Sequence, residues 1–169
     1  MRYVLMVMIL ALTCLGPSMA QATTTPSERE SLRRLPGVSV VIEDIKPNAQ
    51  ADGLSQEAIR TAVELILRSS GIRLLTGTEW QNIPSAPYLY IKVSTAKSKA
   101  GDFYAECVTL ELVQRVSMVQ TPEHVMFAST YEIGGVGSYG AHVLRSLIPD
   151  VIEPLVKEFA NDFLAVNPR

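Results

Sequence analysis

"DFYAECVTLELVQRVSM", residues 102–118, alternates apolar and polar side chains over most of its length. Successive side chains of a β-strand point to opposite faces of a sheet, so this spacing predicts a long strand with one buried face. Glu106 and Gln114 share that face with apolar residues, and we interpret both as places where the cover over the core ends. The apolar members of the face are Tyr104, Val108, Leu110, Leu112, Val116 and Met118.

Two further alternating runs, residues 88–95 ("YLYIKVST") and 125–133 ("VMFASTYEI"), flank this strand. The connections between the three runs are short and contain Gly or Pro, which is typical of turns. The runs are therefore predicted to form an antiparallel meander. One face of the meander is predicted to bury Leu89, Ile91, Val93, Val108, Leu110, Leu112, Phe127 and Tyr131.

Upstream, the pattern predicts a β-α-β unit. Residues 37–45 are rich in Val and Ile and predict a strand. Residues 53–72 predict a helix, with Ser55 as its N-cap and Gly71 in the left-handed conformation at its end. Residues 72–75 predict a short second strand, and residues 76–87 predict a connection with one helical turn around Trp80.

Downstream, residues 139–166 hold apolar side chains at helical spacing. Pro149 and Pro154 interrupt this helix, because proline lacks an N–H donor and crowds the preceding turn. We therefore predict a kinked helix or two abutting helices. The predicted fold class is α+β, a β-α-β unit followed by a three-strand antiparallel meander and the C-terminal kinked helix, with the helices on one face of a mixed sheet.

The first twenty residues, "MRYVLMVMILALTCLGPSMA", have the tripartite form of a secretory signal peptide. Their apolar run is short for a membrane span, which needs about 20 residues. We predict cleavage after Ala20, a mature chain that starts at Gln21, and a periplasmic or secreted location. An uncleaved anchor and a lipoprotein acylated at Cys14 are the alternatives. Residues 21–35 predict a flexible lead-in, and residues 36–169 predict a single domain with no integral membrane segment.

Charge and motifs argue against two classes of ligand. The formal net charge is −2, so no basic excess indicates nucleic-acid binding. Residues 133–142, "IGGVGSYGAH", contain G-x-G-x-x-G, but a dinucleotide site also needs a following parallel strand, and none is predicted. We expect the glycines to form a tight strand-to-helix reversal capped by Ser138, with no cofactor. A weak anion site at that helix N-terminus is the alternative.

Cysteine and histidine are scarce. Cys107 is the one cysteine outside the leader, and His124 and His142 are the only histidines. A catalytic cysteine needs a histidine base beside it, and the sequence places neither histidine there. The spacing of the three residues matches no zinc motif, so we expect no metal. We interpret Cys107 as a half-buried strand residue and keep a small hydrolase using Cys107 or His142 as an alternative.

Several stretches together resemble a family of small exported bacterial proteins of unknown function, from about Val38 to Pro168. These are "GLSQEAIRTAVELILRSSGIRLLTGTEW", "PYLYIKV", "LELVQRV", "FASTYEIGGVG" and "EFANDFLAVNP". The order of elements is also loosely similar to that of envelope-assembly domains, the amino-terminal domain of TolB and the lipoprotein LptE. The family resemblance implies no known activity and transfers no functional residue, and a shared fold order does not fix function.

An export signal, an α+β pattern and the absence of a catalytic motif predict a non-enzymatic binding or interaction domain. If the helices cover one sheet face, the other face is the candidate interaction face, and it meets an envelope protein, a second copy of the chain, or water. A small-molecule carrier with an apolar pocket between sheet and helices is the alternative. The predicted interaction face carries Tyr90, Lys92, Thr109, Glu111, Val113, Arg115, Ala128 and Thr130.

Overall fold

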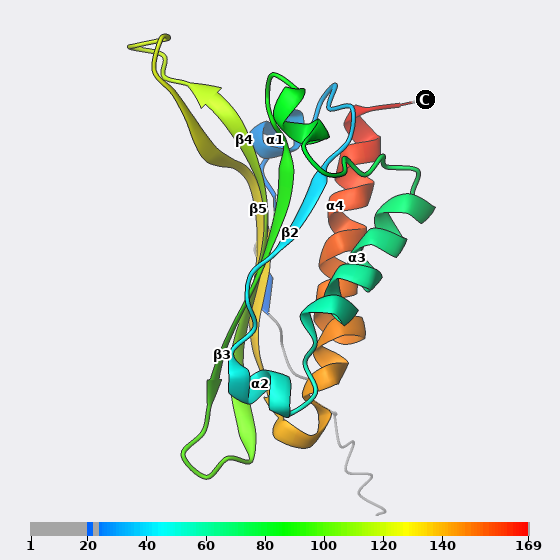
Figure 1. The fold of residues 1–169 in the computed structure, drawn as a ribbon, viewed down its shortest axis with the longest axis vertical. Coiled ribbons are helices and arrows are strands. Elements are labelled where there is room, and N and C mark those ends of the chain that lie inside the picture. The colour runs from blue at the N-terminus through cyan, green and yellow to red at the C-terminus, as the bar shows by residue number, and fades with distance from the viewer. Residues whose placement is uncertain (1–19, 22–23, 169) are drawn as a thin grey trace, which may run out of the picture.

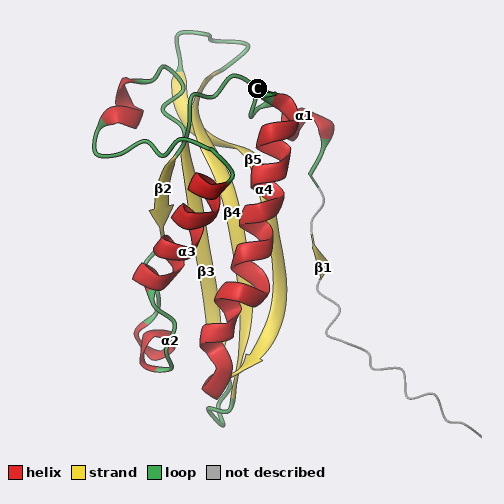
Figure 2. Ribbon diagram, turned by 90° about the vertical axis from the view of Figure 1, so that its right-hand side faces the viewer, coloured by secondary structure: helices red, strands yellow, loops and turns green. Residues whose placement is uncertain are grey.

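The computed structural model describes residues 20–21 and 24–168, and residues 1–19 of the predicted signal peptide 1–20 lie outside them. The fold is α+β, as predicted, with a mixed sheet packed against one layer of helices (Figures 1 and 2). The strands are β1 (Ala20–Gln21), β2 (Ser39–Ile42), β3 (Tyr88–Lys97), β4 (Phe103–Ser117) and β5 (Val125–Gly140). The helices are α1 (Pro26–Glu30), α2 (Pro47–Ala51), α3 (Gln56–Ser69) and α4 (Glu153–Val166), with short segments η1 (Glu79–Asn82), η2 (Ala141–Ser146) and η3 (Ile148–Ile152).

The strand order across the sheet is β1-β5-β4-β3-β2. Strands β3, β4 and β5 form the predicted antiparallel meander. Strand β2 runs parallel to β3, so β2, the helices that follow it and β3 complete a β-α-β unit. At the opposite edge, β1 pairs antiparallel with β5, with Ala20 opposite Val136.

The predicted strand at residues 72–75 is reduced to one parallel bridge, between Val38 and Leu74. Two side chains of α3 account for this. Arg60 donates a hydrogen bond to the Val40 carbonyl at 3.0 Å, and Gln56 donates to the Ile42 carbonyl at 2.9 Å. With these two carbonyls engaged, the outer edge of β2 offers no continuous ladder to another strand.

Helix α3 begins and ends as the sequence predicts. The Ser55 hydroxyl accepts a hydrogen bond from the Ala58 amide at 3.3 Å, which satisfies one of the free donors of the first turn. At the other end Gly71 has a φ of 75°, in the left-handed region that glycine tolerates. The Ile72 amide then donates to the Leu67 carbonyl at 2.9 Å, as in a Schellman ending.

The glycine-rich stretch is strand rather than a strand-to-helix loop, which corrects the prediction for residues 133–142. Strand β5 continues to Gly140, and its last residues pair with β4 as far as Phe103. Ser138 pairs with Ala105 inside this ladder and caps no helix. Gly134 is needed for close packing, since a Cβ atom there would lie 2.6 Å from the Val108 carbonyl oxygen.

The C-terminal helical region is interrupted as predicted. A 3₁₀ segment, η2, is followed by a π-helical segment, η3, and then by the regular helix α4. Pro149 lies in the first turn of η3 and Pro154 in the first turn of α4, where the missing N–H donor does least damage. Figure 1 shows this region running along the same side of the sheet as α3.

Residues 24–35 are more structured than the predicted flexible lead-in. Thr25 and Glu28 form a reciprocal capping box at the start of α1, and Leu32, just after the helix, is fully buried. Arg29 of α1 forms an ion pair with Asp162 of α4 at 2.9 Å, and Thr24 donates to the same carboxylate at 2.9 Å. The sequence pattern missed α1 because five residues are too few to show a helical period.

The face of the sheet beneath the helices holds the core, and most of the predicted alternation is confirmed. Phe127 and Met118 are the exceptions, because they are 45% and 44% exposed, and Met118 lies beyond the end of β4. A register shift between Leu112 and Val113 leaves Thr130 without a partner in β4, so the two faces of β5 exchange beyond this bulge. The buried face includes Leu89, Ile91, Val93, Tyr104, Val108, Leu110, Leu112, Tyr131 and Ile133.

Glu106 and Gln114 are buried rather than placed where the core cover ends. The Gln114 amide nitrogen donates to the Ser31 carbonyl at 3.1 Å and to the Thr130 hydroxyl at 2.8 Å. These bonds compensate the burial of a polar group and join β4 to the chain that follows α1. For Gln114, the prediction failed because the segment after α1 supplies a cover that the sequence pattern does not reveal.

Candidate functional site

The helices leave the second face of β3, β4 and β5 bare, and we call this surface the open face (Figures 1 and 2). Alternation and register place Tyr90, Lys92, Thr109, Glu111 and Arg115 together on it, where the sequence predicted them. Tyr90 lies directly opposite Glu111, and Lys92 lies opposite Thr109. Val113, opposite Tyr88, shares the face.

Thr130 and Ala128 do not belong to the open face, which corrects two of the predicted positions. Thr130 is the bulged residue, and its hydroxyl is engaged by Gln114 on the buried face. Its carbonyl accepts a hydrogen bond from the Ser31 hydroxyl at 3.0 Å. Ala128 pairs with Gln114 and therefore points to the helix side as well.

An aromatic cluster occupies the upper end of the open face, and sequence reasoning missed it. The ring centroids of Trp80 and Tyr88 lie 5.5 Å apart, and Phe127 lies 6.4 Å from Trp80 and 6.1 Å from Tyr88. The Arg115 guanidinium lies over the Phe127 ring, 5.7 Å from its centroid. We call these four residues the aromatic–arginine cluster. Tryptophan, tyrosine and arginine are the side chains most enriched at the energetic centres of protein interfaces.

The middle of the open face is acidic. Glu111 lies directly opposite Glu132 on β5, where like charges repel unless a cation intervenes. Burial raises the pKa of the Tyr90 hydroxyl, and the neighbouring carboxylates of Glu43 and Glu111 raise it further. Lys92 lies two residues from Tyr90 along β3 and diagonally across from Glu111, which makes it the cation nearest to these carboxylates in the strand pairing.

The β4–β5 hairpin extends beyond the other strands and projects away from the helices (Figure 1). Strand β3 begins opposite Val113, so the hairpin beyond that point has no third strand. A two-stranded ribbon is only marginally stable by itself in water. Val119, at its tip, is 90% exposed, and the other exposed apolar side chains of the hairpin are Met118, Val125, Met126 and Phe127.

Cys107 and the two histidines do not form a catalytic group in the described part of the chain. Cys107 pairs with Ser94 and Val136 on the open face, whereas His124 lies in the turn at the hairpin tip. His142 follows Gly140, which pairs with Phe103. Phe103 is four residues from Cys107 along β4, about 13 Å for an extended chain. A hydrolase using Cys107 or His142 therefore gains no support from this geometry.

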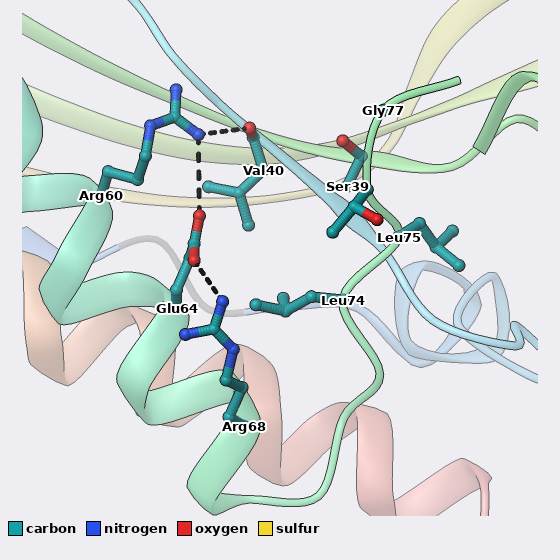
Figure 3. Close-up of a pocket in the computed structure, with 9 residues that line it drawn as sticks. Ser39, Val40, Arg60, Glu64, Arg68, Leu74, Leu75 and Gly77 are labelled. Carbon is teal, nitrogen blue, oxygen red and sulfur yellow. Dashed lines mark hydrogen bonds and ion pairs between the residues drawn. The ribbon is translucent and has the colours of Figure 1, made fainter. Parts of the chain in front are cut away.

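A pocket of 270 Å³ lies between the edge of β2 and helix α3 (Figure 3). Arg60 binds the Val40 carbonyl and lies 3.8 Å from Glu64, which is paired with Arg68 at 2.6 Å. Charged side chains thus cross this pocket, and their hydrogen-bonding groups are engaged with one another. It is not the apolar pocket that the small-molecule carrier requires.

Two other classes of ligand find no site among residues 24–168. No group of three or more His, Cys, Asp or Glu side chains there is arranged to hold a metal ion. Gly135 and Gly137 lie inside β5, and only Gly140 adjoins a helical segment, the short 3₁₀ segment η2. The three glycines therefore do not form the loop before an α-helix that receives a pyrophosphate. In the same part of the chain, no helix combines the length and apolarity that a membrane span requires.

No family model and no curated protein matches the chain. Solved structures similar to it include the PelC dodecamer from Paraburkholderia phytofirmans and a variant of it with one substitution. Each is 18% identical to this chain, and each alignment covers 84% of this chain and 96% of PelC. The TM-scores are 0.43 for the PelC dodecamer and 0.45 for the variant. Similarity at this level assigns neither family nor function, and the resemblances to the exported family, TolB and LptE stay predictions.

Proposed function

We propose that this chain is a non-enzymatic interaction domain, periplasmic or secreted, that binds a protein partner through its open face. The observation that carries the proposal is the placement of helices α1 to α4 away from that face (Figures 1 and 2). Only the short segment η1 reaches it, where Trp80 joins the aromatic–arginine cluster. Phe127 is 45% exposed although three other side chains surround it. A partner that covers this ring gains the free energy of burying apolar surface.

The partner is either an envelope protein or a second copy of this chain. Both would meet the same residues, with the cluster at one end and the acidic pair Glu111 and Glu132 in the middle. The acidic pair favours a partner surface that presents a cation at that position. The projecting hairpin would lengthen the contact, because its apolar side chains have no cover within their own domain.

Cys107 provides a reporter for this proposal, since it is half-buried on the open face, four residues from Glu111 along β4. Its alkylation by a maleimide should be fast in dilute purified mature protein and slower when a partner covers the face. Slowing that depends on concentration in purified protein identifies a second copy. Slowing only in the presence of envelope extract identifies another protein.

Phe127→Ser is the matching variant, because it removes the exposed ring of the cluster while leaving Cys107 in place. Leu65→Ser is its control, since Leu65 is 64% exposed on α3, on the helix side of the molecule. Thermal melts should first show that both variants fold. We expect Phe127→Ser to abolish the slowing of Cys107 alkylation and Leu65→Ser to preserve it. Unchanged protection in Phe127→Ser, or no protection of the wild type under either condition, would refute the proposal.

A further inference from the structure

Glu106 lies on the helix side of β4 and is 4% exposed. Neither of its carboxyl oxygens has a hydrogen-bond partner within residues 24–168. Its neighbour on β3 is Thr95, which is 3% exposed and whose hydroxyl also lacks a partner there. Its neighbour on β5 is Gly137, which has no side chain to offer. Two unsatisfied polar side chains thus lie side by side beneath the helices.

The charged groups around Glu106 are engaged elsewhere or face water. On the same sheet face, the Tyr139 hydroxyl lies 3.4 Å from Asp150 of η3, and the Tyr104 hydroxyl donates to Asp52 at 2.6 Å. Lys97 pairs with Asp52 at 2.5 Å. Two further cations are Lys46, which directly precedes α2, and Arg145 of η2. Lys46 donates to the Thr95 carbonyl at 2.7 Å, and Arg145 and His142 line an exposed groove with Asp52 and Lys97.

No cation in this surrounding forms an ion pair with Glu106 in the described structure. Burial alone raises the pKa of its carboxyl above the ordinary value of 4.5. An ionised carboxylate at this position would lose its hydration without gaining a hydrogen bond, which is among the most costly arrangements in a protein. The neutral carboxylic acid is the form that fits the closed structure.

The helical cover at this end of the sheet is also the least regular. Segment η2, which contacts β4 and β5, is a 3₁₀ helix with Val143 outside helical geometry, at φ −121° and ψ 15°. Segment η3 is π-helical and contains Pro149, which donates no backbone hydrogen bond. Short 3₁₀ and π segments have poorer hydrogen bonds than an α-helix, so this cover should open more easily than α4 does.

We propose that Glu106 is a proton-operated latch, which allows η2 and η3 to pack against the sheet while its carboxyl is neutral and favours their release when it ionises. The proton passes to water, and the carboxylate is hydrated by the water that enters as Ala141–Ile152 lifts from the sheet. The proposal goes beyond the interaction function, because it concerns the opposite face of β4. Either can fail without the other.

The direction with pH follows from the raised pKa. Below the ordinary value of 4.5 the carboxyl is neutral in both the closed and the open state, and closure is fully favourable. As pH rises from there towards the pKa of the closed state, opening releases a proton and becomes about tenfold more favourable for each pH unit. Above the pKa of the closed state the opening constant stays level.

The test combines two measurements on the mature protein between about pH 5 and 9, a range that lies above the ordinary pKa of a glutamate carboxyl. Carbon-13 NMR of the glutamate side-chain carboxyls gives the pKa of Glu106, assigned by its loss in Glu106→Gln. Amide hydrogen exchange, corrected for the intrinsic effect of pH, gives the opening of residues 141–152. Glu111→Gln is the matched control, because Glu111 is on the same strand but on the open face.

We expect protection of residues 141–152 to fall with rising pH in the wild type and in Glu111→Gln, and to stay constant in Glu106→Gln. If Glu106→Gln does not fold, Glu106→Met replaces it, since a similar apolar chain fits a site without polar partners. The latch is excluded if Glu106 titrates near 4.5, if wild-type protection does not change with pH, or if the change persists without the carboxyl.

Discussion

Replacing Leu110 with alanine measures how much stability the helix side of the sheet contributes. Leu110 is 1% exposed, and its neighbours on the adjacent strands are Ile91 and Ile133, which are also buried. The substitution removes three carbon atoms, worth about 0.8 kcal/mol each by transfer from water, or roughly 2.4 kcal/mol. The remaining cavity adds to this loss, so the total should be about 2–5 kcal/mol.

Thr109→Ala is the control for Leu110→Ala, because it lies one residue away on the open face, between Lys92 and Gly134. Surface substitutions usually change stability by about 0.5 kcal/mol or less. With a urea dependence of about 2 kcal/mol per molar, Leu110→Ala should lower the unfolding midpoint by roughly 1–2.5 M, and Thr109→Ala by less than about 0.3 M. Equal midpoints at low protein concentration, or a larger loss for Thr109→Ala, would show that the two faces are assigned wrongly.

Three other changes test separate parts of the structure. Asp162→Ala should cost about 1–3 kcal/mol in urea melts and speed proteolysis near α1, because it removes the partner of Arg29, Thr24 and Tyr131; an unchanged cleavage rate would contradict this anchoring. Gly134→Ala should lower the melting temperature clearly more than Ser138→Ala on the same strand, because only the first places a Cβ atom 2.6 Å from the Val108 carbonyl oxygen. Asp52→Asn should flatten the loss of stability at acid pH, and thermal melts between about pH 3 and 7 check this. Hydrogen bonds from Lys97 and Tyr104 lower the pKa of Asp52 below 3.8, so the stability that Asp52 supplies is present above that value and is lost as pH falls. If the melting temperature of Asp52→Asn fell with acid pH in the same way as that of the wild type, these hydrogen bonds would not contribute to stability.

The elements that sequence predicted well are those whose signals are local. Ser55 and Gly71 bound α3 with side-chain and backbone preferences that act within one helical turn. Alternation in β3 and in most of β4 follows from the two-residue period of a strand, which tertiary contacts do not alter. Strand order and the antiparallel meander then follow, because short turns leave neighbouring strands little choice of partner.

The elements that sequence predicted poorly depend on contacts between distant residues. The glycines of β5 have no strong preference of their own, and pairing with β4 decides that they extend a strand. Residues after Arg73 lose their strand because α3 engages the carbonyls of β2. Glu106 is buried near the end of the sheet where η2 contacts β4 and β5, and a pattern read along β4 alone cannot show such a cover.

The open face was partly predictable for the same reason. The alternation of apolar and polar residues predicted the positions on this face correctly for part of the set, since β3 and β4 keep their two-residue period there. These residues are Tyr90, Lys92, Thr109, Glu111 and Arg115. The same alternation could not predict the aromatic–arginine cluster. Trp80 comes from a connection that has no period, and it reaches Tyr88 and Phe127 only when η1 folds against the sheet. Phe127 itself was assigned to the wrong face.

The bulge at Thr130 decides where the cluster lies. Without this extra residue, alternation from the buried Tyr131 would place Phe127 on the helix side of β5. With it, Phe127 pairs with Arg115 and joins Trp80 on the open face, while Gln114 and the carbonyl of Thr130 are held by the segment after α1. One unpaired residue thus costs the core an aromatic side chain and exposes that side chain on the surface. A bulge of this kind re-aims side chains, and such a loss of burial is expected where the exposed ring is used for contact with another molecule.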